Sequence, residues 1–107
     1  MRELVIVLTT MPDDQRADVL ARTLVAERLA ACVNVHAPMI STYRWQGTIA
    51  RDPERQLVIK TMRGKLQDLE SRLRTLHPYE LPEFIVIDGE ASDAYAVWVA
   101  EAVSTHA

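Results

Sequence analysis

The chain has 107 residues, a mass of 12.1 kDa and a formal net charge of −3. A hydrophobic share of 49% and a charged share of 25% are ordinary for a globular domain and exclude a disordered or collagen-like chain. The weak acidity argues against a nucleic-acid binder, and no apolar run approaches the ~20 residues that cross a bilayer. A lone cysteine, Cys32, permits no internal disulfide. These features predict one cytoplasmic domain over residues 1–107.

The first elements are a buried strand and an amphipathic helix. The β-branched run Leu4–Leu8 predicts a central strand that is buried on both faces and stops at Pro12. Asp13 and Asp14 then stand where a helix cap is needed. Apolar residues at three- and four-residue steps predict a helix from about residue 13 to residue 29, with its apolar stripe in the core.

A long hairpin follows. Its first strand opens at Cys32–Val35 and continues past Pro38 to Trp45. Gln46-Gly47 is a plausible turn, because glycine supplies the positive φ that tight hairpins need. The return strand is expected over residues 48–60.

The last part of the chain predicts a helix, a strand and a helix. Leucines line one face of a helix over 66–76, which Pro78 ends. Phe84–Ile87 reads as a short buried strand, and Asp93 as the cap of a terminal helix. The inner face of that helix is expected to carry Tyr95, Trp98, Val99 and Ala102.

This order defines the fold class. Two βαβ units that share a hairpin give an α+β, ferredoxin-like βαββαβ domain, here with a long central β-hairpin and an extra C-terminal helix.

Each hairpin strand would span on the order of 45 Å, whereas a globule of this size is only ~26 Å across. The hairpin must therefore bend or overhang. With the turn at Gln46-Gly47, Pro38 faces Arg55 and Pro53 faces Ile40, so a bulge or break is expected there.

The hairpin tip carries Tyr43, Trp45 and Ile49, which a lone protomer would expose. We expect these residues to pack against neighbouring subunits in a closed ring. The alternative is a hairpin that folds back onto its own sheet.

Several segments in order resemble one known family. The most specific are LAACVN at 29–34, YRWQG at 43–47 and HPYELPE at 77–83. This order resembles the CutA family of divalent cation tolerance proteins over essentially the whole chain. The resemblance implies a tight homotrimer similar to PII-like signalling proteins and a cytoplasmic role tied to copper and other divalent ions. No organic cofactor is expected.

Two positions depart from the family pattern. Where members often have a proline-glycine pair, this chain reads His36-Ala37-Pro38-Met39, which predicts a local change in the bend. Some members carry a cysteine, proposed as a copper ligand, where this chain has Thr9. A hydroxyl is a poor ligand for copper(I), so cysteine-dependent copper(I) binding is not expected.

The strongest metal-ligand candidates are His77, Glu80 and Glu83, which lie within seven residues. Imidazole and carboxylate suit Cu(II) or Zn(II), and Pro78 and Pro82 stiffen the segment. A trimer can complete the coordination across subunits. The alternative is a rigid connector with Tyr79 packed and both glutamates solvated.

A second hypothesis is an effector site between subunits, by analogy with PII-like trimers. Arg44, Lys60 and Arg63 are candidates to hold an anion there; the alternative is that they are solvated charges. No nucleophile or anion-cradling loop accompanies the strands, so the chain is interpreted as a non-enzyme.

Overall fold

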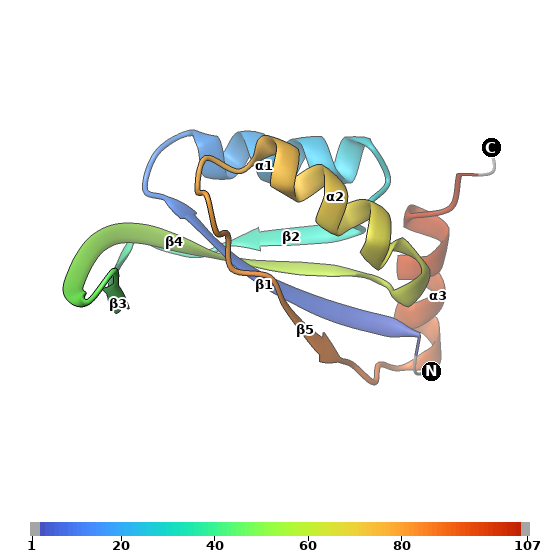
Figure 1. The fold of residues 1–107 in the computed structure, drawn as a ribbon. Helices are drawn as coiled ribbons and strands as arrows, with labels where there is room; N and C mark the ends of the chain where they lie inside the picture. The colour runs from blue at the N-terminus through green and yellow to red at the C-terminus, as the bar shows by residue number, and fades with distance from the viewer. Residues whose placement is uncertain (1–2, 106–107) are drawn as a thin grey trace.

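A computed structural model describes residues 3–105, and its elements follow the predicted order (Figure 1). A single 3-10 turn, Arg63–Lys65, precedes the second helix. The elements are β1 (Leu4–Pro12), α1 (Arg16–Ala26), β2 (Cys32–Val35), β3 (Met39–Trp45), β4 (Thr48–Met62), α2 (Leu66–Leu76), β5 (Ile85–Asp88) and α3 (Asp93–Ala102).

The five strands form one antiparallel sheet in the order β2-β4-β1-β5, and β3 pairs with the far half of β4. Helices α1 and α2 lie over one face of this sheet, and α3 stands at the end away from the hairpin (Figure 1). This arrangement confirms the ferredoxin-like fold with an added helix. No helix within residues 3–105 is long and apolar enough to cross a membrane.

The main core lies between the sheet and helices α1 and α2. The predicted stripe of α1 points inward, with Ala17, Leu20 and Leu24 almost fully buried. Leu69 and Leu73 do the same on α2, one helical turn apart. They pack against alternate residues of β1 and β4, namely Val7, Met11, Leu57 and Ile59.

The first helix is shorter than predicted. Strand β1 continues through Pro12, which pairs with Glu54, and α1 begins only at Arg16. Asp14, rather than Asp13, contacts the helix start: its carboxylate accepts a bond of 2.9 Å from the Arg16 backbone N–H. The end is earlier as well, because Arg28 adopts φ 60°, a left-handed conformation that terminates the helix.

The predicted inner face of α3 is wrong in part. Tyr95 and Trp98 are 39% and 47% exposed and stack on each other with ring centroids 5.6 Å apart. The buried stripe is instead formed by Ala96, Val99 and Val103, at steps of three and four residues. It covers a second small core with Leu4 and Ala31.

Two buried threonines give a matched stability prediction. Thr9 and Thr61 are both 0% exposed, but the Thr9 hydroxyl has no hydrogen-bond partner within residues 3–105, whereas the Thr61 hydroxyl donates 2.8 Å to the Leu29 carbonyl. We expect Thr9→Val to raise the free energy of unfolding by about 1 kcal/mol, and Thr61→Val to lower it by about 1 kcal/mol. Urea unfolding of both variants checks this, and equal effects of the same sign would contradict it.

The hairpin has the predicted turn and the predicted bulge. Gln46 and Gly47 adopt φ 50° and 83°, the positive values of a two-residue hairpin turn. From the pair Val35–Leu57 to the pair Met39–Glu54, one strand advances four residues and the other three. One extra residue is therefore inserted around residues 36–38, which confirms the break expected there.

The outer part of the hairpin projects from the body of the molecule. The principal extents are 46 × 24 × 24 Å, and β3 has its substantial contacts with β4 alone. The hairpin also curves. Its concave side, the inner side, turns toward the segment after α2 (Figure 1). It thus overhangs, as expected from its length, and does not fold back onto the sheet.

The sheet face opposite α1 and α2 is largely uncovered. Helix α3 packs on only one end of it, at Leu4, Ile6 and Met62. Beyond this end the same face carries four apolar residues. Leu8 pairs with Val58 on one side and with Ile85 on the other, and Ile87 lies beside Ile85 on its strand. Leu8 and Val58 are partly exposed, and Ile85 and Ile87 are 47% and 45% exposed. We call these four residues the open sheet face.

Candidate functional site

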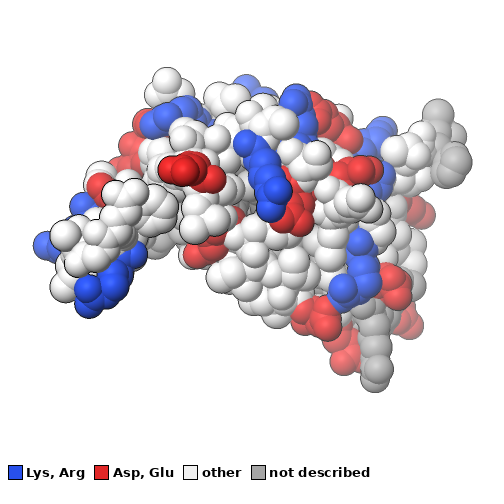
Figure 2. Space-filling view, in the orientation of Figure 1, with Lys and Arg blue, Asp and Glu red and all other residues white. Residues whose placement is uncertain are grey.

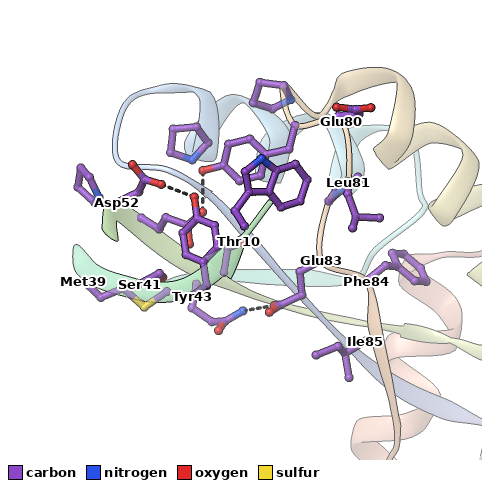
Figure 3. A pocket seen from close by; sticks show the side chains of 18 residues that line it. Thr10, Met39, Ser41, Tyr43, Asp52, Glu80, Leu81, Glu83, Phe84 and Ile85 are labelled. Carbon is purple, nitrogen blue, oxygen red and sulfur yellow. Dashed lines mark hydrogen bonds between the residues drawn. The ribbon is translucent and has the colours of Figure 1, made fainter. Parts of the chain in front are cut away.

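A groove of about 960 Å³ lies between the projecting hairpin and the connector, residues 77–84, which joins α2 to β5. Figure 3 shows side chains of both segments pointing into it. One wall is the inner side of the hairpin, and the other is the connector. Its lining includes Tyr43, Trp45, Asp52, Glu54, Tyr79, Glu80, Glu83 and Ile85.

The strand pleat explains which hairpin residues face the groove. Successive side chains of a strand alternate between faces, so Tyr43 and Trp45 of β3 line the groove. On β4 the residues that face it are Asp52 and Glu54, which pair with Ser41 and Met39. The groove is therefore built from a regular β-ribbon on one side and a proline-stiffened segment on the other.

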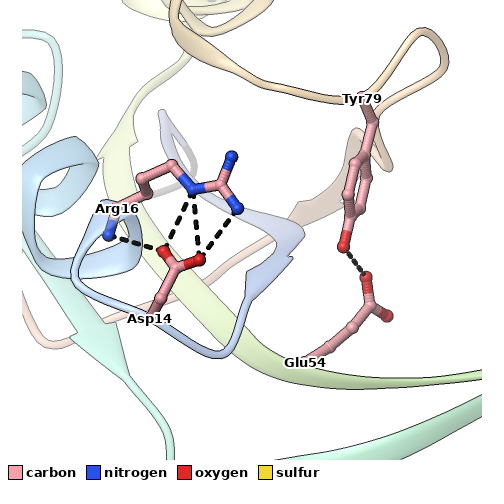
Figure 4. Close-up of polar contacts among 4 residues, drawn as sticks. All are labelled: Asp14, Arg16, Glu54 and Tyr79. Carbon is pink, nitrogen blue, oxygen red and sulfur yellow. Dashed lines mark hydrogen bonds and ion pairs between the residues drawn. The ribbon is translucent and has the colours of Figure 1, made fainter.

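Two tyrosine–carboxylate bonds fix the walls. The Tyr79 hydroxyl donates 2.6 Å to the carboxylate of Glu54, which is 7% exposed, and so ties the connector to β4 (Figure 4). The Tyr43 hydroxyl donates to Asp52 within the hairpin (Figure 3). Burial, followed by the bond to Glu54, raises the pKa of Tyr79, and the bond to Asp52 raises the pKa of Tyr43. Both phenols therefore stay protonated and donate at neutral pH.

The groove is acidic. Asp52, Glu54, Glu80 and Glu83 line it, and among the described residues no lysine or arginine does. Of the four carboxylates, two are bonded by tyrosine and Glu83 accepts a bond of 3.0 Å from the Gln56 amide. The nearby Arg16 does not neutralise them, because it forms an ion pair of 2.8 Å with Asp14 (Figure 4). The groove thus favours cations and disfavours anions.

His77 begins the connector and is held by both ring nitrogens. Nε2 lies 2.7 Å from the Thr10 carbonyl oxygen, and the Tyr79 backbone N–H donates 3.1 Å to Nδ1. This pattern assigns a neutral ring with its proton on Nε2. Burial lowers the pKa of His77, and the side chain is only 7% exposed. His77 therefore anchors the connector and has no free nitrogen for a metal ion.

This anchoring predicts a pH dependence of stability. Because the folded-state pKa of His77 is lowered, the unfolded chain binds the proton more readily. The contribution of neutral His77 to the free energy of unfolding is therefore fully present above the ordinary histidine pKa, and it is lost as the pH falls below that value. We expect the thermal midpoint to fall from pH 7.5 to pH 5.5, and His77→Gln to flatten this dependence, at one fixed protein concentration. His36→Gln, which removes an exposed histidine, is the control; an equal flattening there would contradict the assignment.

The predicted metal ligands are placed on one segment but do not form a three-ligand site. Glu80 is exposed and Glu83 is partly buried, and both line the groove. Within residues 3–105, no group of three His, Cys, Asp or Glu side chains is arranged to hold a metal ion. The carboxylates of Glu80 and Glu83 therefore remain the candidate donors of one chain.

The predicted interface residues are exposed, but on two faces. Tyr43 and Trp45 are each 41% exposed and line the groove. Ile49 is 70% exposed and pairs with Arg44, so it lies on the opposite side of the ribbon. A partner that covers all three must contact both sides of the hairpin.

The predicted anion ligands lie far apart within the chain. Arg44 pairs with Ile49 near the tip of the hairpin, while Lys60 lies in the body of the sheet opposite Ile6. Eleven residues of strand separate those two β4 positions, on the order of 35 Å. Arg63 follows β4 and forms an ion pair with Asp88. One chain does not bring these three cations together.

Comparison with known proteins decides the family. The family model described as CutA1 divalent ion tolerance protein matches residues 5–102. The divalent-cation tolerance protein CutA of Thermus thermophilus is 40% identical over 97 residues, which cover 90% of this chain and 94% of that protein. The crystal structure of CutA from Xylella fastidiosa superimposes with a TM-score of 0.91 at 39% identity, covering 95% of this chain and 99% of that one. This chain belongs to the CutA family.

A further solved structure agrees. CutA from Synechococcus elongatus is 41% identical, with a TM-score of 0.90 over 97% of this chain and 93% of that chain. The resemblance inferred from LAACVN, YRWQG and HPYELPE is therefore confirmed.

Against this CutA background, the departure at Thr9 can be located. Thr9 is fully buried and lies on the helix-covered face of β1 with Val7 and Met11, not in the groove.

The sequence reasoning also missed the two tyrosine–carboxylate pairs of the groove. The hairpin register was predicted correctly. It already places Tyr43 and Asp52 on one face of the ribbon, and this shared face is the sequence signal that indicates their pairing.

Proposed function

We propose that this protein is a cytoplasmic homotrimer that binds copper or other divalent metal ions and takes part in the response to them. Membership of the CutA family, whose relatives are named for divalent-cation tolerance, supports the cation role. The observation that carries the assembly is the open sheet face, which is apolar and lacks a covering layer.

The open sheet face needs a partner because a two-layer α/β domain buries one face of its sheet, while this chain also exposes a group of apolar side chains on the other. Leu8, Val58, Ile85 and Ile87 are contiguous across three strands, and Ile85 also lines the groove. Apolar patches that continue into a groove mark interaction sites. Three copies that cover one another's faces form a closed ring without a free apolar surface.

For metal binding we propose Glu80 and Glu83 as the donors of each chain. Carboxylates suit divalent ions, and a zinc site is closed by four ligands, so donors from more than one subunit are required. His77 is reassigned from ligand to anchor, because coordination would break one of its two hydrogen bonds. The proposal includes no catalysis.

Calorimetric titration of metal-stripped, tag-free protein with Cu(II) and with Zn(II) tests this. We expect saturable binding at a fixed ratio per subunit, lost in Glu80→Gln/Glu83→Gln and kept in His77→Ala. Glu90→Gln/Glu101→Gln, which removes two exposed carboxylates elsewhere, is the matched control. Binding that is absent from the wild type, or unchanged in Glu80→Gln/Glu83→Gln, would contradict the proposed donors.

A second candidate is a PII-like trimer that senses a small molecule. Its supporting observation is the groove, whose 960 Å³ lies in the range of ligand pockets and whose walls are aromatic. The acidic lining favours a cationic ligand over the anion expected from Arg44, Lys60 and Arg63. Wild-type protein that is trimeric but binds neither metal in the titration would favour this candidate.

A further inference from the structure

We propose that the groove binds an aliphatic polyamine, a flexible chain of ammonium groups joined by short methylene segments. This rests on the second candidate function, a small-molecule sensor, and names the class of the molecule. Three features of the groove favour such a ligand. One carboxylate is buried without a cation, the other carboxylates are spread along both walls, and the walls between them are aromatic.

Glu54 is the buried carboxylate. It is 7% exposed, lines the groove and receives one hydrogen bond, from the Tyr79 hydroxyl to Oε2 (Figure 4). Its other oxygen, Oε1, accepts no hydrogen bond from residues 3–105, and Glu54 belongs to no ion pair among them. A buried carboxylate without a cation is costly, because it has lost water and gained no opposite charge. Glu54 therefore favours a ligand that brings positive charge into the groove.

The chain itself does not supply this charge. Within residues 3–105, none of the four groove carboxylates forms an ion pair. Arg55 donates 2.8 Å to the His36 carbonyl, and by strand alternation Arg44 and Arg51 face away from the groove. Figure 2 shows acidic side chains between the hairpin and the body of the molecule, and basic ones at the far end of the hairpin. The groove is thus left with negative charge that a ligand can neutralise.

The carboxylates are spread along the groove rather than gathered at one point. Asp52 and Glu54 stand two residues apart on the hairpin wall, roughly 7 Å along the strand. Glu80 and Glu83 lie on the connector wall, and within residues 3–105 no three such side chains are arranged to hold one metal ion. Within one chain a single small ion therefore meets only part of this charge. An extended polycation instead places successive ammonium groups against successive carboxylates, each in a charge-assisted hydrogen bond.

The walls between the carboxylates are aromatic. Tyr43 and Trp45 line the groove from the hairpin, each 41% exposed, and Tyr79 lines it from the connector. Neither Tyr43 nor Trp45 stacks on another ring among residues 3–105. An ammonium group is attracted to the face of an aromatic ring, and the methylene segments beside it bury apolar surface there. A polyamine therefore uses both the charged and the aromatic parts of the wall, whereas a metal ion uses the carboxylates alone.

The polyamine and a metal ion share one wall of this site. Glu80 and Glu83 are the proposed metal donors, so a divalent ion and the polyamine compete for them, and each should lower the apparent affinity of the other. Asp52 and Glu54 are not proposed as metal donors. The hairpin wall therefore distinguishes the two ligands.

Calorimetric titration of metal-stripped, tag-free protein with spermidine tests the site. We expect saturable binding at a fixed ratio per subunit. Glu54→Gln, which keeps an oxygen for the Tyr79 hydroxyl, should weaken spermidine binding about tenfold, because one charge-assisted bond is lost. The same variant should leave Cu(II) and Zn(II) binding unchanged. Should Glu54→Gln fail to fold, Asp52→Asn, which changes an exposed side chain of the same wall, is expected to weaken spermidine binding in its place.

The aromatic wall is tested by a matched pair of variants at Tyr43. Tyr43→Phe and Tyr43→Leu both lose the hydroxyl that bonds Asp52, but only the phenylalanine keeps an aromatic face. Tyr43→Leu is expected to bind spermidine about threefold more weakly than Tyr43→Phe. Equal affinities of the two variants would contradict the role of the ring.

The outcomes separate the ligand class from the candidate function. Wild-type protein that binds benzyltrimethylammonium but not spermidine overturns the polyamine and leaves a sensor of small organic cations standing. Binding of neither overturns the polyamine and the cationic sensor together. Spermidine affinity that falls as much in Glu90→Gln/Glu101→Gln as in Glu54→Gln reflects the net charge of the chain and overturns the site. Light scattering of the same samples reports the trimer independently.

Discussion

Replacing Ile85 by lysine is expected to dissociate the oligomer while leaving the protomer folded. Ile85 is 47% exposed in the single chain, so its substitution removes little of the core. In the proposed trimer it would lie within a covered apolar face, where an unpaired ammonium group costs several kcal/mol. We expect the concentration of half-dissociation to rise at least about 100-fold, measured by sedimentation velocity.

The adjacent residue provides the matched control. Val86 belongs to the same edge strand and is 39% exposed, but it pairs with Val7 and so faces the helix side of the sheet. Val86→Lys should keep the trimer. Equal dissociation by both substitutions would mean that the strand edge, and not the open sheet face, forms the contact.

Trp45→Ala is expected to have the second large effect. Trp45 is 41% exposed in the wall of the groove, at the tip of the hairpin that is expected to pack against neighbouring subunits. Buried tryptophans are frequent anchors of interfaces, and their truncation costs about 2 kcal/mol or more. This corresponds to a weakening of assembly of roughly 30-fold. Circular dichroism should show an unchanged fold, because the side chain lies outside the core.

The control for this substitution is the other tryptophan. Trp98 is 47% exposed on α3, at the end of the molecule away from the hairpin (Figure 1). Trp98→Ala should change assembly little. If Trp98→Ala dissociates the trimer and Trp45→Ala does not, the interface runs through α3 and the hairpin account fails.

Local patterns in the sequence were sufficient for the element order and the hairpin. The positive-φ turn at Gln46-Gly47 and the clash of Pro38 and Pro53 with a regular ladder are properties of a few adjacent residues. The fold class followed from the order of strands and helices, because connection rules allow few topologies.

The face of α3 was not predictable in the same way. Tyr95, Trp98 and Val99 are all apolar, so the pattern offers more than one stripe, and tertiary packing selects the one with small residues. Val99 and Val103 pack with Leu4 and Ala31, whereas Tyr95 and Trp98 remain 39% and 47% exposed.

The candidate site depends on contacts between segments far apart in the chain. His77 was a plausible ligand by residue type, but its two bonds, to the Thr10 carbonyl and from the Tyr79 backbone, arise only when β1 and the connector meet. The groove likewise needs the curvature of the hairpin, which no short pattern encodes. The acidic lining is visible only once Glu54 and Glu83, 29 positions apart in sequence, share one cavity.

The native mass of the wild-type protein tests the central claim most directly. Light scattering coupled to size exclusion, on tag-free protein over a hundredfold range of concentration, should give three times the chain mass of 12.1 kDa. A constant mass of one chain would contradict the account, because the open sheet face and the apolar side chains of the hairpin tip would then remain in water.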